Sequence, residues 1–406
     1  MSSSTKALLG ACIAGLQNFI NSAGIIVLGF IYAAYPDVSP LDVVTVVTIP
    51  SLVGVIFAFI IGPLSLRFSK KLLILISLFL AAANGLVLYF GVGVAPLWVL
   101  QIGAVLVGIM RGTTRTLLPA VITDNTPVEK HPAYIGYYQA ANTAGGFVVS
   151  VGIALIATQI WQNAFLIYLI YIPIIISSFL LIPKDNPGAS SSRGTAAAPR
   201  ESMWASIRSL PAKIWIYSLF VGLVWVCSYS LVITYSDYII NEFALGGVFE
   251  SSMANNIYMA IGIILGLVTG FIVRIFKKWT VPVCMFIVAV AAFIPFFFHS
   301  LISITLGYSI SMVSCIIFSY LMAKIVSLVP KEKSGLALSI NIGFSNLGSY
   351  FCAAITVAVT GLLGFSVSSS TQLFAAGSIS AVLVIASILL FVVFDKSPKS
   401  SPETAG

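Results

Sequence analysis

The segment LWVLQIGAVLVGIMRGTTRTLLPAVI, residues 97–122, is apolar and long enough to span a bilayer as a helix, yet it contains two arginines. Arg111 and Arg115 are four residues apart, so a helix stacks them on one face. At about 1.5 Å per residue, Arg111 lies roughly 21 Å from the start of the segment, near the middle of the membrane. An arginine at that depth costs roughly 2.5–3.5 kcal/mol, so we expect the pair to face a wet interior lined by protein.

The chain around this segment has the composition of a membrane protein. Of its 406 residues, 59% are hydrophobic and 8% are charged, and the mean hydropathy is +1.08, which excludes an ordinary soluble domain. Repeated apolar runs of about 20 residues predict an all-α polytopic membrane protein with twelve transmembrane helices. The expected spans are residues 6–32, 39–64, 71–91, 97–122, 132–158, 162–182, 213–240, 250–275, 279–298, 301–325, 333–361 and 370–394.

The basic residues fall on one side of this topology. Every second loop contains lysine or arginine, whereas the opposite loops contain neither and carry acidic residues such as Asp37 and Glu242. The positive-inside rule then predicts a multi-pass protein of the plasma (inner) membrane with both termini in the cytoplasm. Because the net charge of +8 comes from these flanking loops, it does not indicate nucleic acid. All five cysteines lie within spans, so we expect no disulfide framework and no metal site.

The sequence also repeats itself. The loop RFSKK at residues 67–71 returns as RIFKK at residues 274–278, and PVEK at residues 127–130 returns as PKEK at residues 330–333. Small residues recur every fourth position in the preceding spans, a spacing that lets helices approach closely. They are Gly54, Ala58 and Gly62 in the second span and Gly262, Gly266 and Gly270 in the eighth. Three matches in the same order, with nearly equal offsets, predict a duplicated six-helix unit.

A Pro-, Gly- and Ser-rich stretch from Pro183 to Thr195 separates the two units and has the composition of a flexible linker. After it, Trp204, Ile207 and Leu210 are compatible with a short amphipathic helix on the membrane surface or with a disordered segment. We predict four parts in order along the chain. They are an N-terminal six-helix bundle (1–185), a cytoplasmic linker (186–209), a C-terminal six-helix bundle (210–396) and a cytoplasmic tail (397–406).

Over essentially its whole length the sequence resembles the major facilitator superfamily of transporters. The most specific element is GPLSLRFSKK at residues 62–71, which is similar to the family's loop between its second and third helices. The resemblance implies a conformational gate at the four matching residues, Gly62, Arg67, Lys70 and Lys71. Leu66 and Ser69 replace an aspartate and a glycine of that motif. The loop thus lacks the aspartate of the charge network that helps to hold the family's outward-facing state.

The resemblance extends to the fourth helix and implies the architecture. Arg111 matches the arginine of the family's fourth-helix motif, whereas Arg115 stands where that motif usually has glycine. The family's fold implies two pseudo-symmetric six-helix bundles, with spans 1, 4, 7 and 10 lining a central cavity. The polar residues of those spans are then candidates for substrate binding: Arg111, Arg115, Gln17, Asn18, Asn21, Tyr229, Tyr235 and Ser311. Polar residues of other spans, among them Tyr138, Asn142, Asn255 and Asn346, either line the cavity or bond between helices.

The arginine pair favours an anionic substrate. Guanidinium groups bind carboxylates in bidentate fashion and stay charged. No carboxylate is expected near mid-membrane, since Asp124 lies at the cytoplasmic end of span four and Asp237 near the outer end of span seven. We therefore predict a secondary active transporter that moves a small organic solute, preferably an organic anion such as a carboxylate, by alternating access. Alternatively, Arg111 is a structural or proton-coupling residue and Arg115 snorkels to the surface.

The sequence leaves open which ion couples transport and allows two rival functions. Asp237 is the candidate coupling residue, so a co-transported proton and an exchanged anion are both compatible with the sequence. One rival is a proton-coupled multidrug or lipid exporter, which a broad cavity rich in Phe and Tyr would favour; a remoter one is a non-transporting membrane sensor. An enzyme is not expected, because no nucleophile–base pair or ATP-binding glycine loop is evident. The expected partners are the solute and the lipid bilayer, without nucleic acid, cofactor or metal, and the protein is expected to be a monomer.

Overall fold

A computed structural model describes residues 3–20, 22–65, 67–126, 131–157, 159–184, 208–329 and 331–393, and regular secondary structure in these ranges is entirely helical. Asn21, Leu66, the loop at 127–130 and nearly all of the predicted linker, with Trp204 and Ile207, lie outside the described residues. So does the predicted tail at 397–406. At Asn18 and Gly62 only the helical backbone is described.

The first half of the chain consists of helices, with a 3-10 segment after α1 and another before α8. In order these are α1 (Ser3–Gly15), η1 (Leu16–Phe19), α2 (Ser22–Ile26), α3 (Leu28–Ala34), α4 (Pro40–Ser65), α5 (Lys70–Gly91), α6 (Leu97–Asn125), α7 (His131–Ile156), η3 (Trp161–Ile170) and α8 (Tyr171–Leu181).

The second half has the same character, with short 3-10 or π-helical turns joined to the α-helices. In order these are α10 (Ala212–Asp237), η5 (Tyr238–Glu242), α11 (Val248–Phe276), η6 (Lys277–Trp279), α12 (Thr280–Phe297), α13 (Leu301–Ile310), η7 (Ser311–Val313), α14 (Ser314–Ser327), α15 (Lys331–Leu362), α16 (Ser369–Ser387) and η8 (Ile388–Val393).

Each of the twelve expected spans coincides with helices, which confirms an all-helical, multi-pass fold. By length and apolarity alone, nine runs among the described residues qualify as membrane spans. One of these, Val248–Phe297, is 50 residues long and contains both α11 and α12. The count of twelve is therefore only partly confirmed.

The first span is not the continuous helix that its apolar run predicts. It tightens into a 3-10 turn at Leu16–Phe19 and breaks again at Val27, where φ is −101° and ψ is 15°. The tight turn lies against α7, because a Cβ on Gly145 would be 2.3 Å from the Leu16 carbonyl oxygen. Close helix packing of this kind determines the local backbone conformation, which the hydropathy of the sequence does not predict.

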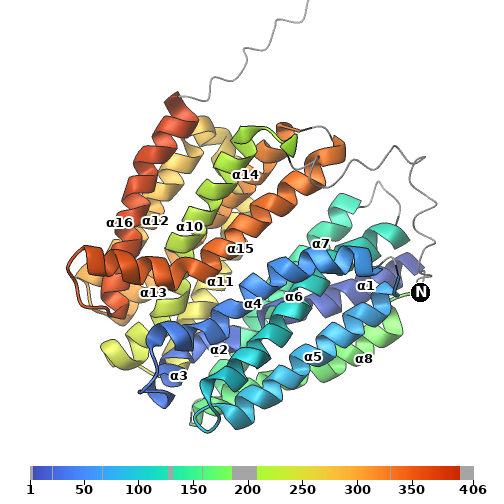
Figure 1. Cartoon of the computed structure of the whole chain (residues 1–406), viewed down its shortest axis with the longest axis horizontal. Coiled ribbons are helices and arrows are strands. Elements are labelled where there is room, and N and C mark those ends of the chain that lie inside the picture. The colour runs from blue at the N-terminus through green and yellow to red at the C-terminus, as the bar shows by residue number, and fades with distance from the viewer. Residues whose placement is uncertain are drawn as a thin grey trace, which may run out of the picture.

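The two halves gather as separate groups of helices that converge near α2 and α3 and splay apart at the opposite end (Figure 1). Between the halves, α4 packs on α15, α7 on α11, and α2 and α3 on α10. The far side denotes the end that carries α3 and the start of α11. The basic side denotes the end that carries residues 67–71 and 274–278 of the two basic loops.

Hydrogen bonds between the halves lie on the far side. The break in the first span removes the intrahelical hydrogen-bond partners of the Ile26 carbonyl and the Gly29 N–H. Both groups therefore need partners from elsewhere in the protein. Ser236 Oγ donates to the Ile26 oxygen at 2.6 Å and accepts from the Gly29 N–H at 3.3 Å. Ser251 Oγ donates to the same Ile26 oxygen at 2.7 Å, and Asn241 Nδ2 donates to the Gly29 oxygen at 2.7 Å. These five residues are called the polar clasp below.

Small residues support close packing in α4 and at Gly262 of α11, where a Cβ would lie 2.7 Å from Met312 Cε, but not further along α11. A Cβ on Gly54 would lie 3.6–3.7 Å from atoms of α6. Gly266 and Gly270 have no atom of the described residues within 4 Å of the Cβ position, so close packing predicted for them is wrong for this structure. The reason is the splayed arrangement, which leaves the basic-side part of α11 away from the other half.

Candidate functional site

A cavity of about 650 Å³ lies between the halves, a size typical of small-molecule sites. The first half contributes residues of α4, α6 and α7, and the second half contributes residues of α10, α14 and α15. All of them come from the middle of a helix or from its basic-side part, whereas the polar clasp joins the halves on the far side. The structure is therefore closed on the far side, with the cavity on the basic side.

A close crossing of α4 and α6 orients the arginine pair. A Cβ on Gly112 would lie 2.6 Å from the Gly54 oxygen, and one on Gly108 would lie 2.5 Å from Val53 Cβ. These contacts leave no room for a side chain, so both glycines face α4 and fix the rotation of α6 about its axis. With that rotation, Arg111 and Arg115 line the cavity on the same helix face.

The two guanidinium groups differ in exposure. Arg111 is half-buried and donates through Nη1 to Ser51 Oγ at 3.4 Å, whereas Arg115 is exposed within the cavity. No acidic side chain lies within ion-pair distance of either arginine in the described part of the chain. The cavity wall therefore carries two neighbouring positive charges without a carboxylate.

The part of the lining contributed by α10 and α14 is largely aromatic and is called the aromatic wall below. Trp225 and Tyr229 of α10 and Phe318 and Met322 of α14 line it. The Trp225 ring centroid lies 6.2 Å from that of Phe318 in an edge contact and 6.4 Å from that of Tyr229. The cavity is thus basic along α6 and aromatic along α10 and α14. Smaller polar side chains complete the lining, including Ser51, Thr116, Asn142, Ser339, Ser345, Asn346 and Ser349, together with Tyr138 of α7.

Of the other predicted binding residues, Tyr229 lines this cavity, whereas Gln17, Tyr235 and Ser311 do not. Gln17 is fully buried, where its Nε2 donates to Thr114 Oγ1 at 3.2 Å and its Oε1 accepts from the Tyr171 hydroxyl at 3.3 Å. It therefore bonds between helices in this structure. The Asn18 side chain and all of Asn21 lie outside the described residues.

Tyr235 and Ser311 belong to the packed interior of the second half. The Tyr235 ring stacks on Tyr308 at 4.3 Å between centroids, and Tyr258 stacks on the other side of Tyr308 at 4.2 Å. Ser311 Oγ donates to the Tyr308 carbonyl at 2.6 Å, a bond within its own helix. A role for either residue in substrate binding stays a prediction.

Asp237 lies at the far-side end of α10, away from the cavity. One carboxylate oxygen accepts from Asn241 Nδ2 and the other from Ser369 Oγ, both at 2.6 Å. The carboxylate thus ties α10 to α16 and contacts Asn241 of the polar clasp. Coupling through Asp237 stays a prediction.

The predicted gate residues near the start of α5 have different surroundings. Lys70 forms an ion pair with Asp124 at the end of α6, whereas the Lys71 ammonium lies over the Phe179 ring at 5.0 Å from its centroid. Arg67 is exposed in the short connection before α5. The ion pair was not predicted, although a lysine and an aspartate at the basic-side ends of adjacent helices were a signal for it.

Trp225 and Phe318 are two of the cavity residues that the sequence alone did not identify. Trp225 is four residues before Tyr229, so the helical period alone puts both on one face of α10. Phe318 offers no such signal, because an apolar ring in a membrane helix faces lipid as readily as a cavity.

The comparisons with known proteins agree with this architecture. The family model described as Major Facilitator Superfamily matches residues 7–351, and the chain therefore belongs to that superfamily. Members of this superfamily are secondary transporters and not enzymes, which defines the class of this membrane-embedded, multi-pass protein. In a comparison with curated protein sequences, none matches the chain.

Solved transporter structures share the fold. A structure of the POT family transporter PepTSo aligns with a TM-score of 0.74 at 12% identity, covering 95% of this chain and 97% of that one. The nucleoside transporter NupG aligns with a TM-score of 0.74 at 11% identity, covering 95% and 100%. A D-xylose-proton symporter aligns with a TM-score of 0.69 at 16% identity, covering 96% and 97%. At these identities the likeness is one of fold.

Proposed function

We propose that this chain is a secondary active transporter for a small organic anion, a carboxylate, in the plasma (inner) membrane. The observation that supports the anion is the pair of arginines on the cavity wall without an acidic partner among the described residues. A carboxylate placed between Arg111 and Arg115 relieves their mutual repulsion and accepts hydrogen bonds from both guanidinium groups. Neither a nucleoside nor D-xylose, which two of the similar proteins are named for, would do so as an uncharged solute.

The aromatic wall narrows the substrate further. A carboxylate bound at Arg115 directs the rest of a small molecule toward Trp225 and Phe318, across the cavity. Aromatic rings there favour an apolar or planar body, because they bury large areas and stack on flat groups. The proposed substrate is therefore an amphipathic carboxylate, with its charge on the α6 side.

Alternating access would use the asymmetry of the two sides. With both termini in the cytoplasm, as the positive-inside rule indicates, the basic side is cytoplasmic and the cavity is accessible from within the cell. Export or uptake then requires the polar clasp to open while the basic side closes. An exchanged anion or a co-transported proton could drive the cycle. For the proton, Asp237 is the candidate, because losing its charge would weaken its bond to Asn241 of the clasp.

The rival function, a proton-coupled multidrug or lipid exporter, is favoured by the aromatic wall taken alone. The two functions differ in what the arginines do. An exporter of cationic or neutral compounds would tolerate removal of both charges, whereas an anion transporter would not.

The test is a thermal-shift screen of purified protein against organic acids, sugars and cationic drugs, followed by uptake into proteoliposomes. For the acid that stabilises best, Arg115→Gln and Arg111→Gln should each weaken binding by tenfold or more, since a charged hydrogen bond contributes roughly 1.5–3 kcal/mol. Arg208→Gln is the matched control, because Arg208 is exposed just before α10 and outside the cavity. Unchanged binding in the double variant would replace the anion proposal with the exporter.

A further inference from the structure

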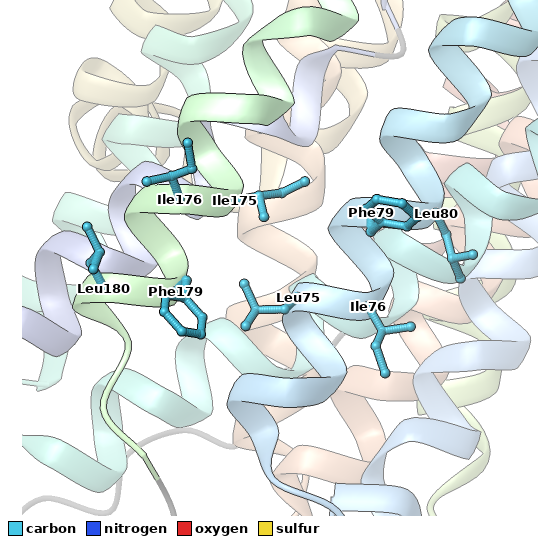
Figure 2. Close-up of a pocket in the computed structure, with 8 residues that line it drawn as sticks. All are labelled: Leu75, Ile76, Phe79, Leu80, Ile175, Ile176, Phe179 and Leu180. Carbon is cyan, nitrogen blue, oxygen red and sulfur yellow. The ribbon is translucent and has the colours of Figure 1, made fainter.

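A second hollow lies on the outer surface of the first half, between α5 and α8 (Figure 2). It is a groove of about 500 Å³ lined entirely by apolar side chains. Four come from α5 and four from α8: Leu75, Ile76, Phe79, Leu80, Ile175, Ile176, Phe179 and Leu180. Several are strongly exposed, with Phe79 at 67% and Leu180 at 67%. In a membrane-embedded bundle such a surface faces acyl chains and not water.

The charges near this groove lie at one end of it. Lys71 is four residues before Leu75 on α5, and Lys184 is four residues after Leu180 beyond α8. Because α5 and α8 run in opposite directions, both lysines are at the basic-side end, where the membrane interface would lie. Their positive charges are close enough to act on each other.

The geometry directs one of these charges to the mouth of the groove. The Lys71 ammonium lies over the ring of Phe179, a groove residue, at 5.0 Å from its centroid, within the range of a cation–π contact. Its neighbour Lys70 points the other way, to Asp124, and so occupies that carboxylate. The groove therefore presents an apolar surface with two ammonium groups at the interfacial end.

We infer that this groove binds an anionic phospholipid, with the phosphate at Lys71 and Lys184 and the start of an acyl chain along the apolar lining. The charge arrangement selects this occupant, because basic residues at the membrane surface attract anionic headgroups and a zwitterionic lipid gains much less. The inference concerns the lipid-facing surface of the first half, so it does not depend on the substrate proposed for the central cavity.

The second half provides a matched control. Lys277 and Lys278 stand at the corresponding place in the repeated loop, before α12, and are exposed. There α12 packs extensively along α16, and neither lysine lies at the mouth of the groove. Replacing this pair removes the same charge from the same side of the protein without touching the groove.

The experiment measures lipid binding to the full chain by native mass spectrometry after delipidation. The probes are phosphatidylglycerol and phosphatidylcholine with identical acyl chains. The wild type should prefer phosphatidylglycerol, and Lys71→Gln with Lys184→Gln should reduce that preference by roughly fivefold for each lysine. Lys277→Gln with Lys278→Gln should leave it within twofold. Filling the groove with Leu75→Trp and Ile176→Trp should weaken binding of both lipids.

Two outcomes overturn the inference. Equal loss of preference in both lysine pairs would mean a general charge effect and no site at the groove. Glycerol phosphate binding as tightly as phosphatidylglycerol, or displacement of the lipid by inorganic phosphate, would identify a free-phosphate site that needs no acyl chain. Since the tryptophan variant keeps every charge, it tests the groove even if the lysine variants fold poorly.

Discussion

Removing the hydroxyls of Ser236 and Ser251 should shift the protein from the conformer closed on the far side toward one open there. These hydroxyls make three of the four hydrogen bonds of the polar clasp: two to the Ile26 carbonyl and one from the Gly29 N–H. In the alanine variant the two backbone groups stay buried without these partners while the far side is closed. Opening exposes them to water, so the substitution destabilises the closed conformer selectively.

The size of the shift follows from the number of bonds. A net contribution of about 1 kcal/mol for each of the three bonds gives about 3 kcal/mol, because a buried backbone group left unpaired pays its full desolvation penalty. That corresponds to a change of roughly 150-fold in the ratio of closed to open conformers. A protein that is 99% closed would become open in about 60% of its molecules.

The assay is labelling of a single cysteine in the cavity from the far side. Asn346→Cys, on a cysteine-free background, places the thiol on the cavity lining contributed by α15. A membrane-impermeant reagent added on the far side should label it slowly in the parent and far faster after Ser236→Ala with Ser251→Ala.

Ser230→Ala is the control, because Ser230 is buried in the same helix as Ser236 but its hydroxyl donates to Val226 at 2.6 Å within α10. It should leave far-side labelling unchanged. Equal labelling of the clasp variant and the parent, with both proteins folded, would refute the reasoning that these bonds hold the far side closed.

Three further predictions concern topology and packing. Single cysteines between Ser190 and Thr195 and between Ala244 and Gly247 should react from opposite sides of the membrane; reaction from the same side would contradict the twelve-span topology. Gly112→Ala should lower the free energy of unfolding by about 1–3 kcal/mol, since the new methyl would lie 2.6 Å from the Gly54 oxygen. The control Gly266→Ala should have no effect, because the space around Gly266 is open. Equal effects of the two substitutions in a thermal melt would contradict the α4–α6 crossing. Asp124→Asn should cost only about 1 kcal/mol, because solvent reaches the carboxylate of the Lys70–Asp124 pair; a much larger loss on denaturation would contradict this screening.

Several features could be predicted because they follow from local rules. The apolar runs predicted the helices, since only helices and closed barrels satisfy every backbone group within lipid. The four-residue spacing of Arg111 and Arg115 placed both on one face, and both line the cavity. Tyr229 was predicted on another ground, because the family resemblance implies that span seven lines the cavity, and Tyr229 does line it.

Other features were beyond the sequence because they depend on how helices rotate and cross. Gln17 and Asn142 are both amides in membrane spans, yet Gln17 is sealed against Thr114 and Tyr171 while Asn142 lines the cavity. The residues that flank Gln17 and Asn142 in the sequence do not indicate which of the two faces the cavity. The break at Val27, which supplies the backbone groups of the clasp, lies inside an unbroken apolar run.

By itself, then, the sequence determined the helical, multi-pass class and the shared face of the two arginines, whereas the sidedness of the basic loops and the duplication of a six-helix unit stay predictions. These depend on hydropathy, charge and the helical period, which are properties of short segments. Only the tertiary structure decided which polar groups face the cavity, which bond between helices, and that Trp225 and Phe318 form the aromatic wall. The physical reason is that lipid is as apolar as a protein interior, so hydrophobicity cannot tell the two faces of a membrane helix apart. Close contacts such as that of Gly112 with Gly54 set the helix rotation instead.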